Sequence, residues 1–250
     1  MENQKVVQID PQIEAQVQAF AAQFHFGVQG LEKTEAQMIA DAKRVMEKGY
    51  HLRAFDSEIG FLKKAIELFG DYFKIHVPID YPMGRSFMVK KMRELEYAAQ
   101  NGCIDCCVCL NYGHIFDHDY RAVEREAAQI QDSFGGHYEK LAFVIPAMLM
   151  TDTEIVAVVS ALDQAGAQTI KVNPGCGLGA SFEEVALIYR KFGHDRFDVH
   201  PSGNIRTLSQ VETFLELGCT TIHSRAMFEI TEEYRNKLYA GKGGEARGQQ

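Results

Sequence analysis

The sequence predicts a single (β/α)8 barrel, and three observations support this fold class. Eight short apolar runs recur about every 28 residues, which is the spacing of one strand followed by one helix. Four of the intervening helices begin with a capping box, and four end at a glycine just before the next apolar run. The first run lacks the glycine-rich phosphate turn that an open, doubly wound sheet would carry there.

The first expected element is a helix that precedes the barrel. After Asp10-Pro11, apolar residues recur with helical spacing at Ile13, Val17, Phe20 and Ala21. We assign residues 1–23 to this N-terminal helical extension, which should cover an open end of the core. The barrel is assigned to residues 24–240, and the Gly-rich, polar tail 241–250 is expected to be flexible.

The barrel elements follow in order along the chain. The expected strands span residues 24–28, 51–55, 74–79, 104–110, 141–146, 169–172, 197–201 and 220–224. The capping boxes are Thr34-x-x-Gln37, Thr151-x-x-Glu154, Ser181-x-x-Glu184 and Thr207-x-x-Gln210. The glycines that end helices are Gly49, Gly102, Gly166 and Gly218. A single capping box is weak evidence for a helix start, but four capping boxes in phase with four helix-ending glycines indicate repeated βα units.

Composition narrows the class of protein. The 250 residues carry a formal charge of −8, which argues against nucleic acid as the main partner. There is no apolar stretch long enough to cross a membrane and no secretory signal at the start, so we expect a cytoplasmic protein. The six cysteines show neither a zinc-ligand spacing nor a disulfide framework, and we interpret them as reduced thiols, most of them buried in a strand. No metal or other cofactor is expected.

Alternation along each strand separates residues that face the helices from residues that line the barrel. In Thr169-Ile-Lys-Val, the aliphatic residues Ile170 and Val172 should face the helices, so Lys171 points inward. The same rule places polar residues of other strands in the interior: His25, His76, Asp80, Asp105, Cys107, Cys109, Asp198, His200, Ser202 and His223. Chemistry is expected at the C-terminal ends of these strands.

Lys171 is the main candidate for catalysis. Burial of an ammonium without a partner costs several kcal/mol, so the pKa of this group should fall. A neutral amine in a dry pocket attacks carbonyl groups and forms a Schiff base. Two alternatives stay open: Lys171 is paired with an interior carboxylate such as Asp105 or Asp80, or the strand is out of phase and Lys171 lies in solvent.

Other candidates have weaker support. His200, on the next strand, has the same inward parity as Lys171 and can relay protons near neutral pH. Asp80 precedes a turn at a strand end, where it serves either as an acid or base or as a cap of the following helix. His25 and His223 fit lining better than catalysis, and Asn173, two residues after Lys171, is assigned to substrate binding.

Glycine turns after the last three strands suggest a site for an anion. The segments are Gly175-x-Gly-x-Gly179, Ser202-Gly203-Asn204 and Ser224-Arg225. Backbone N–H groups and helix N-termini converge there in barrels of this type, and Arg225 can add a bidentate contact. The alternative is that these glycines only make tight turns.

Several of these motifs resemble deoxyribose-phosphate aldolases, from about Phe24 to about Arg225. The matching segments are Tyr81-Pro-Met-Gly84, Thr151-Asp-Thr-Glu, Ala165-Gly-Ala-Gln-Thr-Ile-Lys171, Gly175-x-Gly-x-Gly-Ala-Ser181 and Ser202-Gly-Asn-Ile-Arg-Thr207. The resemblance implies a metal-free class I aldolase in which Lys171 is the Schiff-base lysine. The sequence departs from the family at two partners: His200 stands at its second lysine, and Cys107 at its catalytic aspartate, with Asp105 two residues earlier.

The residues and the resemblance together predict a class I aldolase that acts on a small anionic, sugar-like carbonyl compound, and a phosphorylated one is expected. Lys171 would form the imine, and His200 with Cys107, Asp105 or Asp80 would move protons. The substrate-binding set is His25, Asn173, Gly175, Ser202, Gly203, Asn204, His223, Ser224 and Arg225. Two alternatives remain: an imine-independent isomerase or lyase that uses His and Asp, and a sugar-phosphate-binding barrel without catalysis. Self-association is compatible with the sequence, which shows no interface.

Overall fold

The strands form one parallel sheet that curls into a barrel. The computed structural model describes residues 10–27 and 33–245. The strands are β1 (Phe24–Gly27), β2 (Ala54–Asp56), β3 (Ile75–Ile79), β4 (Asp105–Cys109), β5 (Lys140–Ile145), β6 (Thr169–Val172), β7 (Asp198–Pro201) and β8 (Ile222–His223). From β1 to β7, each strand pairs with its neighbours in sequence, and β8 pairs with β1. A bridge between Ser202 and His223 joins β7 to β8, so the predicted (β/α)8 barrel is confirmed.

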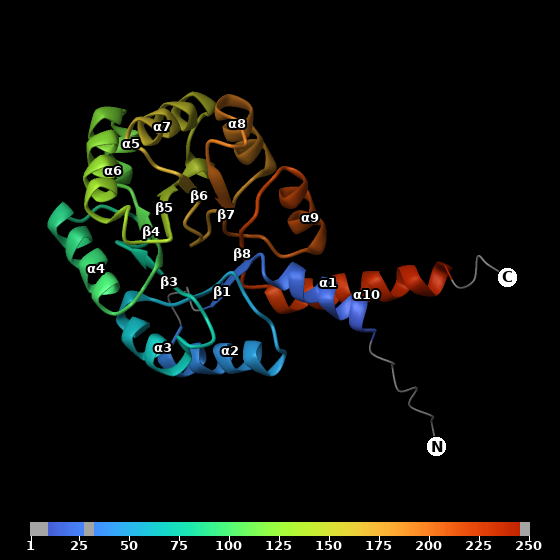
Figure 1. The fold of residues 1–250 in the computed structure, drawn as a ribbon. Coiled ribbons are helices and arrows are strands. Elements are labelled where there is room, and N and C mark those ends of the chain that lie inside the picture. Colours follow the sequence, from blue (N-terminus) through green and yellow to red (C-terminus); the bar gives the residue numbers. More distant parts are fainter. Residues whose placement is uncertain (1–9, 28–32, 246–250) are drawn as a thin grey trace, which may run out of the picture.

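Helices surround the sheet as an outer ring (Figure 1). They are α1 (Pro11–Ala21), α2 (Glu35–Glu47), α3 (Leu62–Phe69), α4 (Met88–Gln100), α5 (Tyr112–Phe116), α6 (Tyr120–Phe134), α7 (Asp152–Gln164), α8 (Phe182–Phe192), α9 (Leu208–Glu216) and α10 (Met227–Glu245). Short 3-10 turns occupy Ile59–Phe61 and Ala147–Leu149. None of the helices in the described ranges is long and apolar enough to cross a bilayer.

The helix start and stop signals that the sequence predicted are present in the structure. Helices α2, α7, α8 and α9 each begin with a reciprocal capping box, at Thr34, Thr151, Ser181 and Thr207. The four helix-ending glycines all have positive φ, between 66° and 101°, a region that costs a residue with a Cβ about 1–2 kcal/mol. These local signals fix where each helix starts and stops, and therefore how the strands enter the barrel.

The N-terminal helix packs along the last helix. Phe20 of α1 stacks on Tyr234 of α10 at 4.1 Å between ring centroids, and Arg235 forms an ion pair with Glu14. The two helices lie side by side next to β1 and β8 (Figure 1). Contacts between Asp10 and both Tyr239 and Lys242 hold the end of α10. This helix consequently continues to Glu245, through the first part of the segment 241–250. Residues 1–9, 28–32 and 246–250 lie outside the described residues.

The strand boundaries differ from the expected ones mainly at β2. The sequence predicted residues 51–55, whereas β2 spans Ala54–Asp56. His51 instead stacks on Tyr72 at 5.3 Å, outside the ladder. The ladder pairs Ala54 with His25, and Asp56 with both Gly27 and His76. The shift matters because it brings a carboxylate, Asp56, into the barrel interior.

Candidate active site

The barrel interior has an apolar side and a polar side. Cys107, Cys109, Ala142 and Val144 of β4 and β5 form a small buried cluster that Tyr81 covers. Opposite this cluster lie buried ionisable side chains from β1, β2, β3, β6, β7 and β8 and from the first residue of β4: His25, Asp56, His76, Asp105, Lys171, His200 and His223. The inward parity that was predicted for these strands is therefore correct. All six cysteines are free thiols, as expected.

Lys171 lies at the boundary between the two sides. Its neighbours Ile170 and Val172 pack into the core between sheet and helices, which turns the lysine inward, where it is 1% exposed. Its Nζ lies 3.9 Å from the Cys107 Sγ. Within the described part of the chain, no carboxylate oxygen lies within 4.0 Å of this Nζ. Both alternatives for Lys171, an ion pair and a position in solvent, are thus excluded for the described residues.

His200 is the register partner of Lys171 on the neighbouring strand β7. Its Nε2 lies 3.0 Å from Asp198 Oδ2, and Lys140 and Thr220 also contact that carboxylate. Burial lowers the pKa of His200, even though Asp198 opposes the shift. The neutral imidazole is therefore favoured, and a neutral imidazole can accept a proton.

Acid should weaken the contacts of Asp198, and Asp198→Asn tests this expectation. Burial alone would raise the pKa of this carboxyl, but His200 and Lys140 hold it well below its usual range. A carboxyl group whose pKa is lower in the folded state than in the unfolded state stabilises the fold. This contribution to the free energy of unfolding is complete above the unfolded-state pKa of about 4, and it is lost as the pH falls through the folded-state pKa. The free energy of unfolding by urea should therefore differ most between wild type and variant above about pH 5, and the difference should shrink toward pH 3. Asp195→Asn, at an exposed acid nearby, is the control; a pH-independent difference for Asp198→Asn would contradict the assignment.

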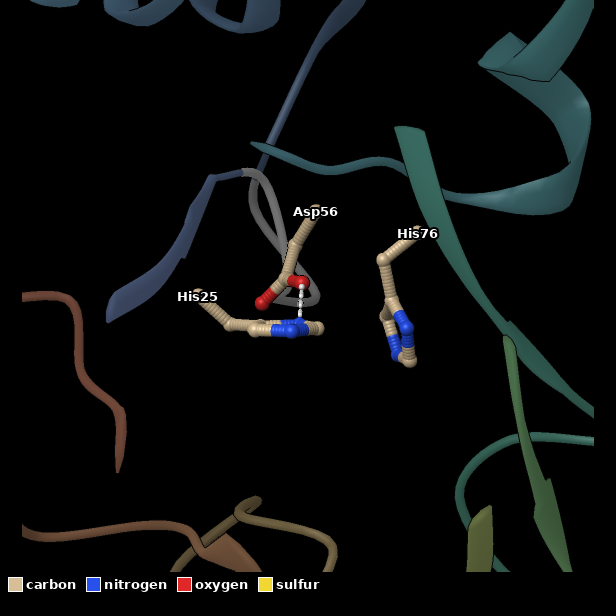
Figure 2. A group of neighbouring side chains, drawn as sticks. All are labelled: His25, Asp56 and His76. Carbon is tan, nitrogen blue, oxygen red and sulfur yellow. Dashed lines mark hydrogen bonds and ion pairs between the residues drawn. The ribbon is translucent and has the colours of Figure 1, made fainter. Parts of the chain in front are cut away.

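A network of histidines and carboxylates fills the polar side of the interior. His25 Nδ1 lies 3.2 Å from Asp56 Oδ1, and His76 Nδ1 lies 2.6 Å from Asp105 Oδ1. His25 Nε2 is 3.7 Å from Asp105 Oδ2, so His25 lies between the two carboxylates. Figure 2 shows the side chains of His25, Asp56 and His76 converging from three neighbouring strands. The arrangement couples four strands through buried charge.

The network shifts the proton affinities of its members. Burial alone would lower the pKa of His76, but the charges of Cys107 and Asp105 raise it to about 10. The pKa of Asp105 is lowered by His25 and His76 against the effect of burial. Burial alone would raise the pKa of the Cys107 thiol, but the positive charges of Lys171 and His76 lower it. Cys107 is thus placed and polarised to exchange a proton beside Lys171.

A cavity of about 770 Å³ opens at the C-terminal ends of the strands. Eight of the predicted substrate-binding residues line it: His25, Gly175, Ser202, Gly203, Asn204, His223, Ser224 and Arg225. Asp56 and Tyr81 line it as well, whereas Lys171 does not. The cavity therefore reaches the network around Lys171 through residues that the two regions share, His25, Asp56 and His223.

The rim of the cavity combines glycine turns with cationic side chains. Asn204 takes the left-handed region (φ 56°), which asparagine tolerates better than most residues. Lys33 and Arg206 join Arg225 in the lining. Lys33 and Arg206 were not predicted from the sequence, because they lie in loops and the alternation along a strand does not predict which loop side chains turn toward the cavity.

Gly203→Ala should disturb this rim more than a comparable change elsewhere. A Cβ at Gly203, where φ is +83°, would lie 2.1 Å from the Leu178 carbonyl oxygen, so the two turns could no longer touch. We expect a loss of about 2–4 kcal/mol in the free energy of unfolding, measured in urea, together with weaker substrate binding. Gly49→Ala is the matched control, because Gly49 has φ +66° but nothing within 4 Å of the added Cβ. Equal losses in the two variants would show that the close approach does not matter.

Two predicted site residues have other roles. Asp80 binds the backbone N–H of Ser86 and the ammonium of Lys90, with Lys91 at 3.7 Å, and it does not line the cavity. It therefore organises the start of α4, and the acid–base role is not supported. Asn173 donates to the Gly179 carbonyl and to Glu184, and accepts from the Met148 N–H. Asn173 thus pins the loops after β5 and β6 instead of facing the cavity.

Two interior residues were not assigned a role from the sequence. His76 was placed inside the barrel by its parity, but nothing in its own strand indicated the contact with Asp105. Asp56 was missed because the predicted strand ended one residue too early. A signal was present in the sequence. Phe55 faces outward and is fully buried in the core between sheet and helices, so its neighbours Ala54 and Asp56 must face the barrel interior.

The chain is similar in sequence to known deoxyribose-phosphate aldolases. No family model matches the chain. The deoxyribose-phosphate aldolase of Aciduliprofundum boonei is 30% identical over 196 residues, which cover 77% of this chain and 88% of the relative. That of Staphylococcus carnosus is 27% identical over 74% of this chain and 84% of the relative.

Solved structures agree on the fold. The tetrameric deoxyribose phosphate aldolase of Aeropyrum pernix superposes with a TM-score of 0.77 at 17% identity, over 91% of this chain and 99% of that one. An aldolase named QR15 gives 0.79 at 21% identity, over 88% and 97%. With the buried lysine and the adjoining cavity, these similarities define a (β/α)8-barrel enzyme of the aldolase type, a lyase. The chain belongs to the deoxyribose-phosphate aldolase family, as a divergent member.

Proposed function

We propose that the protein is a class I aldolase in which Lys171 forms an imine with a small phosphorylated carbonyl substrate. The observation that carries this proposal is the environment of Lys171: a fully buried amino group, beside a polarised thiol and next to a cavity, without a carboxylate in contact among the described residues. Imine formation requires the uncharged amine. Against the effect of burial, the positive charge of Lys171 lowers the pKa of Cys107, so the adjacent sulfur is available as a thiolate that can accept the ammonium proton before the amine attacks.

The reaction can be written with these residues. The amine of Lys171 attacks the carbonyl carbon, and water leaves the carbinolamine to give an iminium ion. The bond between the α and β carbons then breaks: its electron pair forms the enamine, and the β-hydroxyl loses its proton as an aldehyde departs. Protonation of the enamine carbon and hydrolysis of the imine release the second carbonyl product and restore the amine.

The proton transfers are assigned to three neighbours of Lys171. Cys107 is nearest, at 3.9 Å from the Nζ, and its lowered pKa lets it exchange protons with the carbinolamine. His200 is adjacent on β7 and favours the neutral form. Asp105 acts through His76, which it contacts at 2.6 Å. Together they take the place of the family's aspartate and second lysine.

The phosphate is assigned to the rim of the cavity. Gly175, Gly203 and Asn204, whose backbone N–H groups are the proposed donors to the anion, line the cavity together with Ser224 and Arg225. A helix N-terminus and cationic side chains stabilise an anion by the helix dipole and by charge-assisted hydrogen bonds. Lys33 and Arg206 add positive charge to the same lining.

Substrate-dependent inactivation by borohydride tests the proposal. Borohydride reduces an imine to a stable amine, so the enzyme should lose activity only when reductant and a productive carbonyl compound are present together. A panel of sugar phosphates, including deoxyribose 5-phosphate, and oxo acids should contain the compound that causes this loss. Full activity after treatment with a compound that is turned over would contradict the imine.

A second candidate function is favoured by the histidine network. An isomerase or lyase without an imine would use His25, with Asp56 or Asp105, and His200 as acids and bases, since these groups lie next to the cavity or its floor. It predicts that Lys171→Met keeps turnover while His200→Ala abolishes it. A barrel that only binds its ligand would instead show thermal stabilisation by that ligand and no turnover of any compound.

We also propose that the protein assembles with copies of itself. The Aeropyrum pernix relative with the same fold is tetrameric. On this chain, Met83, Phe87 and Val89, near the start of α4, are 58%, 85% and 66% exposed, which is unusual for apolar residues. Light scattering coupled to gel filtration should give a mass above that of one 28.1 kDa chain.

A further inference from the structure

The polar half of the barrel interior contains more metal-binding groups than an imine mechanism uses. Four imidazoles, of His25, His76, His200 and His223, lie with neighbouring ring centroids 4.2 to 6.0 Å apart, and two carboxylates, Asp56 and Asp105, lie among them. All are buried. Such a concentration of histidine and carboxylate groups is typical of sites for transition metals.

Three of these residues lie close enough to share one ion. One donor atom each from His25, Asp56 and His76 falls within 4.8 Å of the others. Figure 2 shows that the three side chains point toward one another from neighbouring strands. Donors around a tetrahedral zinc ion lie about 3.3 Å apart, so the most distant donor atoms would have to approach each other by up to about 1.5 Å to complete the site.

Ring nitrogens in the cluster are left without hydrogen bonds. His25 Nε2 and His76 Nε2 are buried and unsatisfied, and so is the Nε2 of the neighbouring His223. A buried polar atom without a partner costs about 1–3 kcal/mol, which makes several of them on one wall unusual. An ion that displaces the ring proton of His76 and binds the freed nitrogen, together with the lone pair of His25, supplies the missing partner.

The contacts of His76 match those of a metal-binding histidine. Its Nδ1 lies 2.6 Å from Asp105 Oδ1, which orients the ring and leaves Nε2 directed to the interior. In metal sites, ligating histidines commonly donate the second ring N–H to a carboxylate in this way. Asp105 is therefore the natural outer partner of a His76 ligand.

We propose that His25, Asp56 and His76 bind one divalent transition-metal ion, with Zn²⁺ as the favoured ion and Asp105 as the outer partner of His76. Imidazole and carboxylate donors suit Zn²⁺ and Co²⁺, and three protein ligands leave one position open. His25 and Asp56 line the cavity, so an ion can enter from it and the open position faces it. This site was not anticipated from the sequence, where only cysteine spacings were considered. Lys171 is not a ligand, but the site shares His76 and Asp105 with the proton transfers of the proposed function, so each proposal needs its own readout.

Titration of the full-length, chelator-treated protein with Zn²⁺ and Co²⁺ tests this proposal. Calorimetry should show one tight Zn²⁺ site per chain, and Co²⁺ should produce visible absorption bands of a low-symmetry site. His76→Gln and Asp56→Asn should each weaken Zn²⁺ binding by at least 100-fold, and Asp105→Asn by about 10- to 100-fold. Circular dichroism of each variant checks that it is folded.

Two variants serve as controls. His118→Gln removes an exposed histidine, paired with Glu154 at 2.8 Å, and should bind Zn²⁺ as wild type does. Lys171→Met should also bind normally, so failure of the imine proposal and failure of this one can be told apart. The metal site would be overturned if the wild-type protein bound no Zn²⁺, or bound it no more tightly than the folded His76→Gln variant does. The histidines and carboxylates would then only exchange protons.

Discussion

Lys171→Met should lower kcat by about 1000-fold or more, because it removes the only nucleophile of the proposed reaction while keeping the volume of the side chain. Among the described residues the other fully buried lysine is Lys91, which is bound to Glu126 and to the Cys109 carbonyl and cannot take over. Steady-state kinetics on the borohydride-sensitive substrate measure the effect. Lys191→Met, at an exposed lysine of α8, is the matched control and should stay within twofold of wild type. A Lys171→Met enzyme that keeps a tenth of the activity would favour the acid–base alternative.

Asp105→Asn should cause the second largest effect, on stability. Asp105 balances the charge of His76, whose pKa is raised to about 10, and it also lies 3.7 Å from His25 Nε2. Removing one partner of a buried ion pair leaves the other charge uncompensated, which costs about 3–5 kcal/mol in the free energy of unfolding. Urea unfolding at pH 7 measures this loss. Asp132→Asn, at an exposed acid of α6, should change stability by less than about 0.5 kcal/mol.

A double substitution separates the ion pair from simple packing. If the cost of Asp105→Asn comes from an unpaired imidazolium, adding His76→Gln should cost much less than the sum of the two single variants. Additive losses would mean that each side chain contributes through its own packing and not through the pair.

The fold was predictable because its signals are local and repeated. Capping boxes such as Thr207-x-x-Gln210 and helix-ending glycines such as Gly218 act within one turn of chain, and the structure shows both. The strand alternation around Lys171 was equally clear, since aliphatic residues on both sides admit only one orientation of a buried strand. The inward position of the candidate lysine therefore followed from the four residues Thr169 to Val172.

The rest of the site depends on contacts between strands that are far apart in sequence. Alternation about Phe55 could have placed Asp56 inside the barrel, but its position beside His25 and His76 depends on the register of β2 against β1 and β3. Asp80 and Asn173 have inward parity, but both adopt positive φ just beyond their strands, which redirects their side chains to neighbouring loops. Alternation holds only while the backbone stays extended, so it fails at strand ends, where the candidate binding residues lie.

The most direct test of the central claim is to locate the bond to substrate. After borohydride treatment with a productive substrate, peptide mass spectrometry should find the reduced adduct on Lys171 and on no other lysine. An adduct elsewhere, or an unmodified chain recovered from an enzyme that turns the compound over, would contradict the account.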